Sequence, residues 1–140
     1  MYRLAGHRAG EANALNAVGW CHSRLGAHEQ ALTFCQRALA QLEELGDRTG
    51  QGHTWESIGH ANHHLGRYGE ALACYGHALD LYRETGGRYF EADTLTRVGE
   101  THQAAGAKDA ARADWQHALD ILTELGHPDA AQVSARLTGA

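Results

Sequence analysis

Residues 53–82 read HTWESIGHANHHLGRYGEALACYGHALDLY and contain two helical patterns separated by a turn centred on Gly66. The same arrangement recurs on both sides of this stretch at an interval of 40 residues. Such a fixed interval predicts a helical repeat protein whose copies stack on one another. The interval links Gly19, Gly59 and Gly99; Gly26, Gly66 and Gly106; Ala31, Ala71 and Ala111; Ala38, Ala78 and Ala118; Leu39, Leu79 and Leu119; and Gly46, Gly86 and Gly126.

Two kinds of glycine differ in their place in the pattern. Gly19, Gly59 and Gly99 fall inside a helical pattern, where Gly is less favourable than Ala by about 1 kcal/mol. An unfavourable residue that recurs in every copy predicts the close approach of a neighbouring helix. Gly26 and Gly46, with their copies, each follow the end of an apolar pattern. We therefore expect them to end helices in the left-handed conformation that Gly adopts without a Cβ clash.

The apolar residues follow the i, i+3, i+4 spacing of buried helix faces. With one proline in the chain and no alternation typical of strands, the sequence predicts an all-α domain of antiparallel helix pairs. Tyr2 and Gly6 match Tyr82 and Gly86 in the repeat register, which indicates that a repeat precedes the first complete copy. We expect residues 1–7 to be the tail end of that preceding repeat, 8–47, 48–87 and 88–127 to be repeats, and 128–140 to be a capping helix or a truncated fourth repeat, with Pro128 in its first turn.

The second repeat combines aromatic, glycine and alanine residues at a characteristic spacing: Trp55-x2-Ile58-Gly59, then Gly66-x-Tyr68-x2-Ala71-x3-Tyr75-x2-Ala78. This pattern resembles the tetratricopeptide repeat, whose usual length is about 34 residues. The present repeat is longer, lacks the proline that often closes the second helix, and replaces Tyr68 by His28 and Lys108 in the other copies.

The connecting residues between copies extend the resemblance. The segment Leu45-Gly46-Asp47-Arg48-x2-Gln51 is similar to long-repeat arrays of actinomycete antibiotic regulatory proteins and of MalT-like transcriptional regulators. Kinesin light chains and Pins-type adaptors have similar long repeats. The resemblance implies a right-handed superhelical solenoid in which the first helix of each pair lines a concave, partner-binding groove.

Composition excludes several classes of protein. A net charge of −5 argues against a general nucleic-acid surface, and no segment has the length and apolarity of a membrane span or the pattern of a signal peptide. Cys21, Cys35 and Cys74 form no metal or redox motif, so we expect buried free thiols in a reducing cytoplasm. Of the 12 basic residues all but Lys108 are Arg, a bias that suits a high-GC bacterium.

The resemblance places a protein or peptide partner against the polar side of the first helices. Trp20 stands out there because its copies are His60 and Glu100, so the repeat itself does not require an aromatic residue. Trp20 is either an apolar anchor for the partner or packs against its own helix or a preceding repeat. A clamp for a C-terminal carboxylate is not expected, because only Arg24, with Arg97 near the edge, could serve. The predicted groove comprises Asn13, Asn16, Trp20, Ser23, Arg24, His53, Glu56, His60, His63, His64, Asp93, Thr96, Glu100 and Gln103.

Histidines in the second repeat suggest an alternative function. His60 and His64 have the i, i+4 spacing of zinc ligands, but a third ligand would have to come from Glu100 or another helix. A glutamate at position 61 would be needed for a metalloprotease motif, and Ala61 occupies it. The alternatives are a solvated polar groove, a metal- or pH-responsive cluster that also includes His53 and His63, and a self-associating fragment with exposed terminal repeats.

No activated nucleophile, phosphate-binding loop or paired-carboxylate pattern is present in the sequence. We therefore expect neither catalysis nor a metal or other cofactor. The predicted function is that of a cytoplasmic protein-interaction scaffold, which forms the regulatory or sensor part of a larger bacterial transcriptional regulator or signalling protein. Direct contact with nucleic acid or membrane is not expected.

Overall fold

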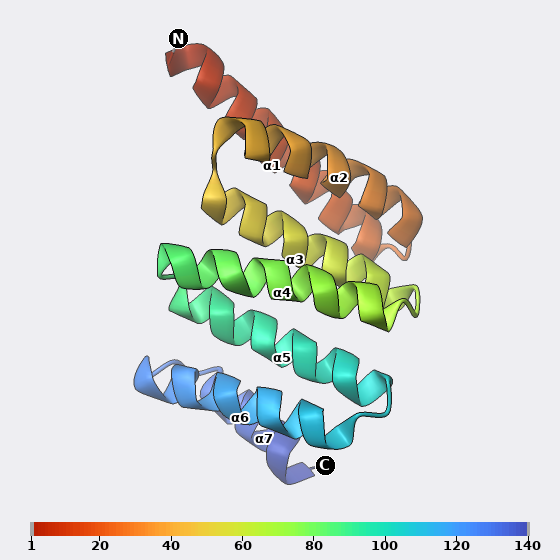
Figure 1. Ribbon diagram of the computed structural model, residues 1–140, viewed down its shortest axis with the longest axis vertical. Coiled ribbons are helices and arrows are strands. Elements are labelled where there is room, and N and C mark those ends of the chain that lie inside the picture. The colour runs from red at the N-terminus through yellow and green to blue at the C-terminus, as the bar shows by residue number, and fades with distance from the viewer. Residues whose placement is uncertain (1, 140) are drawn as a thin grey trace.

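The computed structural model describes residues 2–139, and the side chains of residues 10–139. Within that range the chain forms seven helices and no strand, which confirms the predicted all-α solenoid of antiparallel helix pairs. Figure 1 shows the helices stacked in chain order from one end of the molecule to the other. The helices are α1 (Tyr2–Arg24), α2 (His28–Leu45), α3 (Arg48–His64), α4 (Tyr68–Thr85), α5 (Arg88–Ala104), α6 (Lys108–Glu124) and α7 (Ala130–Gly139).

All six turns between helices are built in the same way. The turn glycines, from Gly26 to Gly126 at 20-residue steps, have φ angles between 62° and 87°. The residue after each glycine donates its N–H to the carbonyl five positions earlier; in the first turn Ala27 donates to His22 over 2.8 Å. This is the hydrogen bond of a left-handed helix end, where a side chain would be strained. The predicted role of these glycines is therefore confirmed.

The glycines that recur inside the first helix of each pair are required by side chains of the facing helix. A Cβ added to Gly59 would lie 2.7 Å from Cε1 of Tyr75, well inside van der Waals contact. Gly99 faces the ring of Trp115 in the same manner. Both rings are core residues, each with a relative exposure of 2%. The close approach predicted from the recurring glycines is therefore present.

Each helix packs against its neighbours in sequence, and α3 also contacts α1 and α5. The odd-numbered helices thus share one side of the stack, which we call the odd-helix face. A hydrophobic core runs from α4 to α7 and a second one joins α2, α3 and α4. In the part of the chain that the structure describes, no helix combines the length and apolarity needed to cross a bilayer.

The first helix differs from the prediction in two respects. α1 continues without a break through Gly6, where we expected the preceding repeat to end, because a continuous helix satisfies backbone groups that a short separate segment would leave open. Cys21 is exposed, although we expected it to be buried, and Val18 on the same helix is 41% exposed. The copy of Cys21 in α3, Ala61, is fully buried because it belongs to the core that joins α2, α3 and α4.

The last helix packs against α6 and adds Val133 to one end of the core. Val133 is 4% exposed and belongs to the same core as Trp115. α7 begins at Ala130 rather than in the turn containing Pro128. The reason is local: the N–H of Asp129 donates to Nδ1 of His127, and the N–H of Ala130 donates to the carbonyl of His127, which forms a turn before the helix.

Candidate functional site

A cleft of about 440 Å³ lies on the odd-helix face between α1, α3 and α5. Aromatic side chains form much of its wall, with Trp20 from α1 and both Tyr89 and Phe90 from α5. Polar and charged groups from the same three helices complete it. Six of the predicted groove residues line this cleft: Asn13, Asn16, Trp20, His53, Glu56 and Asp93.

Trp20 packs on two sides and remains partly exposed. Its ring centroid lies 4.6 Å from that of His60, with the planes tilted by 44°. The guanidinium carbon of Arg97 lies 5.4 Å from the same ring, within the range of a cation–π contact. Trp20 is thus held by α3 and α5, and its exposed part faces the cleft.

Arg97 lies at the centre of the site rather than near its edge. Its Nε is 2.9 Å from Oε1 of Glu56 and 3.4 Å from Oδ2 of Asp93. The side chain of Glu56 is only 12% exposed, and its other carboxylate oxygen accepts a hydrogen bond from the hydroxyl of Tyr82 over 3.2 Å. One partly buried polar network therefore joins α3, α4 and α5 at the cleft.

The buried network changes the protonation of Glu56. Burial, and then the neighbouring carboxylate of Asp93, raise the pKa of Glu56 to about 8, while Arg97 and the Tyr82 hydroxyl act in the opposite direction. Oε1 of Glu56 accepts no hydrogen bond within the described part of the chain, although it is close to Arg97. This carboxyl group therefore holds its proton to a higher pH than an exposed glutamate would.

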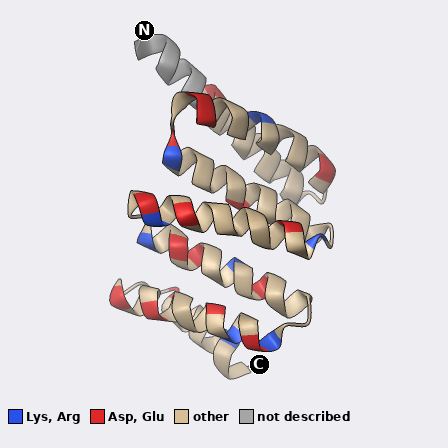
Figure 2. Cartoon of the chain, in the orientation of Figure 1, with Lys and Arg blue, Asp and Glu red and all other residues tan. Residues whose placement is uncertain are grey.

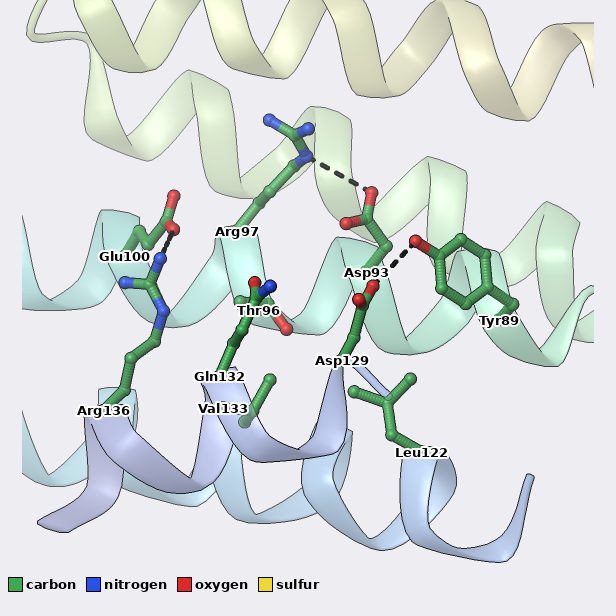
Figure 3. A pocket seen from close by; sticks show the side chains of 10 residues that line it. All are labelled: Tyr89, Asp93, Thr96, Arg97, Glu100, Leu122, Asp129, Gln132, Val133 and Arg136. Carbon is green, nitrogen blue, oxygen red and sulfur yellow. Dashed lines mark hydrogen bonds and ion pairs between the residues drawn. The ribbon is translucent and has the colours of Figure 1, made fainter. Parts of the chain in front are cut away.

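A second, smaller hollow of about 180 Å³ continues the face between α5 and α7 (Figure 3). It shares Tyr89, Asp93 and Arg97 with the cleft. The hydroxyl of Tyr89 donates to Oδ2 of Asp129 over 3.0 Å, and Arg136 pairs with Glu100 over 2.7 Å. Of the predicted groove residues, Asp93, Thr96 and Glu100 line this second hollow.

Four imidazoles gather beside Trp20 at the other end of α3. The ring of His64 lies 4.4 Å from that of His60, 4.9 Å from that of His28 and 5.1 Å from that of His63. Burial, and then cationic neighbours beginning with His64, lower the pKa of His60 to about 3, so its ring is neutral at physiological pH. His28 belongs to α2 and was not among the predicted site residues.

The histidine cluster does not form the metal site considered from the sequence. Glu100, the candidate third ligand beside His60 and His64, is paired with Arg136 instead. Among the residues whose side chains are described, no group of three or more His, Cys, Asp or Glu is arranged to hold a metal ion.

Several predicted groove residues lie outside both hollows. Ser23 is 4% exposed and hydrogen-bonds to Nδ1 of His28 over 2.8 Å, so its assignment to the groove was wrong. His63 hydrogen-bonds to Thr101 over 2.8 Å and Arg24 is exposed at the end of α1. Gln103 lines separate hollows beside Trp115.

Sequence reasoning missed Tyr89 and Phe90. They are 36% and 38% exposed, among the few large hydrophobic side chains that remain open to solvent. Their copies in the second repeat are Thr49 and Gly50, so the repeat itself does not call for aromatic residues there. That contrast was the available signal, and it is the same signal that drew attention to Trp20.

The stacked helix pairs and the cleft on the odd-helix face define a helical-repeat scaffold. Comparison with known families specifies the class: residues 50–124 match one tetratricopeptide repeat family and residues 14–49 match another. The chain belongs to the tetratricopeptide repeat family, whose domains are non-catalytic scaffolds that generally mediate protein–protein interaction. Comparison with curated protein sequences gave no match.

Solved structures show the same fold at low sequence identity. The tetratricopeptide repeat domain of Arabidopsis FLU superimposes with a TM-score of 0.75 at 17% identity, over 84% of this chain and 98% of that domain. The apo form of RapI gives 0.83 at 15% identity over 92% of this chain, and BtubC (BKLC) from P. vanneervenii gives 0.80 at 20% identity over 97% of it. The chain spans 47% of RapI and 58% of BtubC. These likenesses concern the fold alone.

Proposed function

We propose that this chain binds a peptide or protein segment in the cleft between α1, α3 and α5. The observation that carries the proposal is the meeting of Trp20, Tyr89 and Phe90 at one cleft, although none of the three is required by the repeat. Partly exposed aromatic residues in a hollow are typical anchors of protein interfaces. The interaction role general to the family supports the same function.

Selection of peptides from a phage-displayed random dodecapeptide library would test this function. The selected peptides should bind the purified chain, and Trp20→Ala should weaken the tightest of them by about 30-fold or more, the effect of losing a central anchor of about 2 kcal/mol. Asp80→Ala, at an exposed position of α4, is the matched control and should leave affinity unchanged. Failure to obtain any peptide that depends on Trp20 or Phe90 would refute groove binding.

We further propose that the chain is the regulatory or sensor part of a larger cytoplasmic bacterial regulator. The long repeat and the dominance of Arg over Lys support this context. The reading frame that encodes the sequence should then also encode a DNA-binding or nucleotide-binding domain. An uninterrupted frame without such a domain would contradict the proposal.

Self-association through α1 is a second candidate function. Leu25 is 83% exposed and Val18 is 41% exposed, and both border an apolar hollow of about 230 Å³ that also includes Cys21. Their copies are Ile58, which is buried in the core that joins α2, α3 and α4, and Leu65, which packs against that core. Sedimentation velocity should then reveal a concentration-dependent dimer that Val18→Lys abolishes under reducing conditions. A monomer at all concentrations would exclude this candidate and leave groove binding untouched.

A further inference from the structure

We infer that the segment bound on the odd-helix face presents a basic side chain, Lys or Arg, to the place where Tyr89, Asp93 and Asp129 meet. This inference rests on the proposed function, because it names the chemistry of the partner that the groove receives. It goes beyond that function in assigning a charge to the partner and a position to the charge.

The charge of the face favours a cation. The cleft and the adjoining hollow are lined by two guanidinium groups and by the carboxyl groups of Asp93, Glu100 and Asp129, besides Glu56, whose pKa is raised. Both guanidinium groups already have partners, since Arg97 pairs with Glu56 and Asp93 and Arg136 pairs with Glu100. The whole chain carries a net charge of −5, and Figure 2 shows acidic positions along much of the stack. An acidic segment would meet repulsion here, whereas a basic one gains from complementarity.

The position of the charge follows from the partners of each carboxylate. Asp129 accepts a hydrogen bond from the uncharged hydroxyl of Tyr89, and its nearest basic group, Nδ1 of His127, is 3.7 Å away. The carboxylates of Asp93 and Asp129 are 37% and 36% exposed, so a partner can reach both. Figure 3 shows these two side chains with Tyr89 at one end of the hollow, opposite the Arg136–Glu100 pair.

An aromatic ring beside two reachable carboxylates matches the chemistry of a Lys or Arg side chain. The carboxylates accept charge-assisted hydrogen bonds, and the ring of Tyr89 receives the cation or its aliphatic stem. Phe90 and Trp20 lie on the cleft side of the same face, where they can bury the apolar neighbours of the basic residue. The basic side chain thereby fixes the register of the bound segment.

Three synthetic pentapeptides that differ only in the central residue provide the probes: Ac-Gly-Gly-X-Gly-Gly-amide with X as Arg, citrulline or Glu. Citrulline keeps the shape of Arg and removes its charge. In nitrogen-15 NMR titrations of the full chain, the Arg probe should shift the amide signals of Asp93 and Asp129 and bind about tenfold more tightly than the citrulline probe. The Glu probe should produce no shift at these positions, and added salt should weaken the Arg probe. Equal or tighter binding of the Glu or citrulline probe would overturn the inference.

Asp129→Asn tests the position of the charge. Asn keeps an acceptor for the Tyr89 hydroxyl, so the fold should be unaffected, and a thermal melt verifies this. The variant should bind the Arg probe about tenfold less tightly, and Asp93→Asn should act similarly. Asp80→Asn on α4 is the matched control and should leave Arg-probe binding unchanged. If Asp129→Asn and Asp93→Asn both bind the Arg probe like the wild type, the inference fails.

The dodecapeptide library separates this inference from the proposed function. Peptides that depend on Trp20 but show no enrichment of Lys or Arg would remove the inference and leave groove binding standing. Peptides enriched in Lys or Arg whose affinity falls in Asp129→Asn would support both.

Discussion

Two adjacent positions of the repeat behave in opposite ways. Gly59 is Gly in every copy, and its backbone packs directly against the ring of Tyr75. The next position holds Trp20, His60 and Glu100 in the successive copies. The first position packs against the second helix of the same repeat, and the second position lies on the odd-helix face. The comparison teaches that a helix position that keeps one residue type can be fixed by packing, while variable positions on the odd-helix face are free to serve recognition.

The same division extends to the start of α5. Glu91 sits in the copy position of Gln51, and both side chains are buried and polar. The two residues before Glu91, Tyr89 and Phe90, replace small residues of the second repeat and border the cleft. The two positions that gain aromatic residues at the start of α5 are therefore positions that border the cleft. The following predictions test this division.

Enlarging the recurring glycine should produce the largest loss of stability. In Gly59→Leu, the new side chain collides with the ring of Tyr75, which is itself buried. We expect the free energy of unfolding to fall by about 3 kcal/mol, the upper part of the usual range for overpacking. Urea denaturation followed by circular dichroism measures it. Gly76→Leu in α4, where an added Cβ meets no atom within 4 Å, is the control and should not destabilise; comparable losses in the two variants would show that contact with Tyr75 is not the cause.

The turn glycines should matter through backbone conformation alone. Gly66 and Gly76 both have open space for a Cβ, but only Gly66 has a positive φ, of 77°. Gly66→Ala should therefore lose about 1–2 kcal/mol of unfolding free energy, whereas Gly76→Ala should gain up to about 1 kcal/mol from helix propensity. Thermal and urea denaturation of the pair give the answer. Equal effects at the two sites would refute a conformational requirement at Gly66.

The histidine cluster should make stability depend on pH. Burial lowers the pKa of His60 in the folded state to about 3, so below the unfolded pKa of about 6.5 the unfolded state binds more protons. Protonation of His60 in the unfolded state therefore lowers the free energy of unfolding progressively as the pH falls below about 6.5, and has little effect above that pH. Allowing for the partial exposure of the ring, we expect about 1 kcal/mol less stability from His60 at pH 5 than at pH 7.

The neighbours of His60 require a difference measurement. The pKa values of His28 and His64 are also lowered, whereas the raised pKa of Glu56 gives a slope of the opposite sign between its unfolded and folded values. Urea unfolding is therefore measured for the wild type and for His60→Gln at pH 5 and at pH 7. The contributions of the other groups cancel in the difference between the two proteins. The wild type should lose about 1 kcal/mol more than the variant on acidification; identical losses would show that His60 does not resist protonation.

The sequence predicted the parts of the molecule that depend on local chemistry. Gly46 and its copies follow apolar patterns, and a left-handed helix end needs only the residues around it, so these turns were predictable. The central place of Arg97 was not, because it depends on Glu56 and Trp20 reaching it from two other helices. Its position borders the buried stripe, where a small rotation of the helix decides which way the side chain points.

Contacts between helices also explain the other differences. Ser23 belongs by helical spacing to the polar side of α1, yet His28 of α2 bonds to it and covers it. Cys21 has the apolar spacing of a buried residue but is exposed, whereas its copy Ala61 is buried in the core that includes residues of α2. In each case the decisive neighbour lies on a different helix. Spacing along one helix therefore gives the face of a residue but not what covers that face.

The affinity of Trp20→His for the tightest library-selected peptide tests the division between packing and recognition most directly. The substitution gives the first repeat the residue that the second repeat has at this position, His60. We predict that the dissociation constant rises by about 30-fold or more, while the free energy of unfolding changes by about 1 kcal/mol or less through the lost contacts with His60 and Arg97. An unchanged dissociation constant would contradict the account, because the variable aromatic residue would then contribute nothing to recognition.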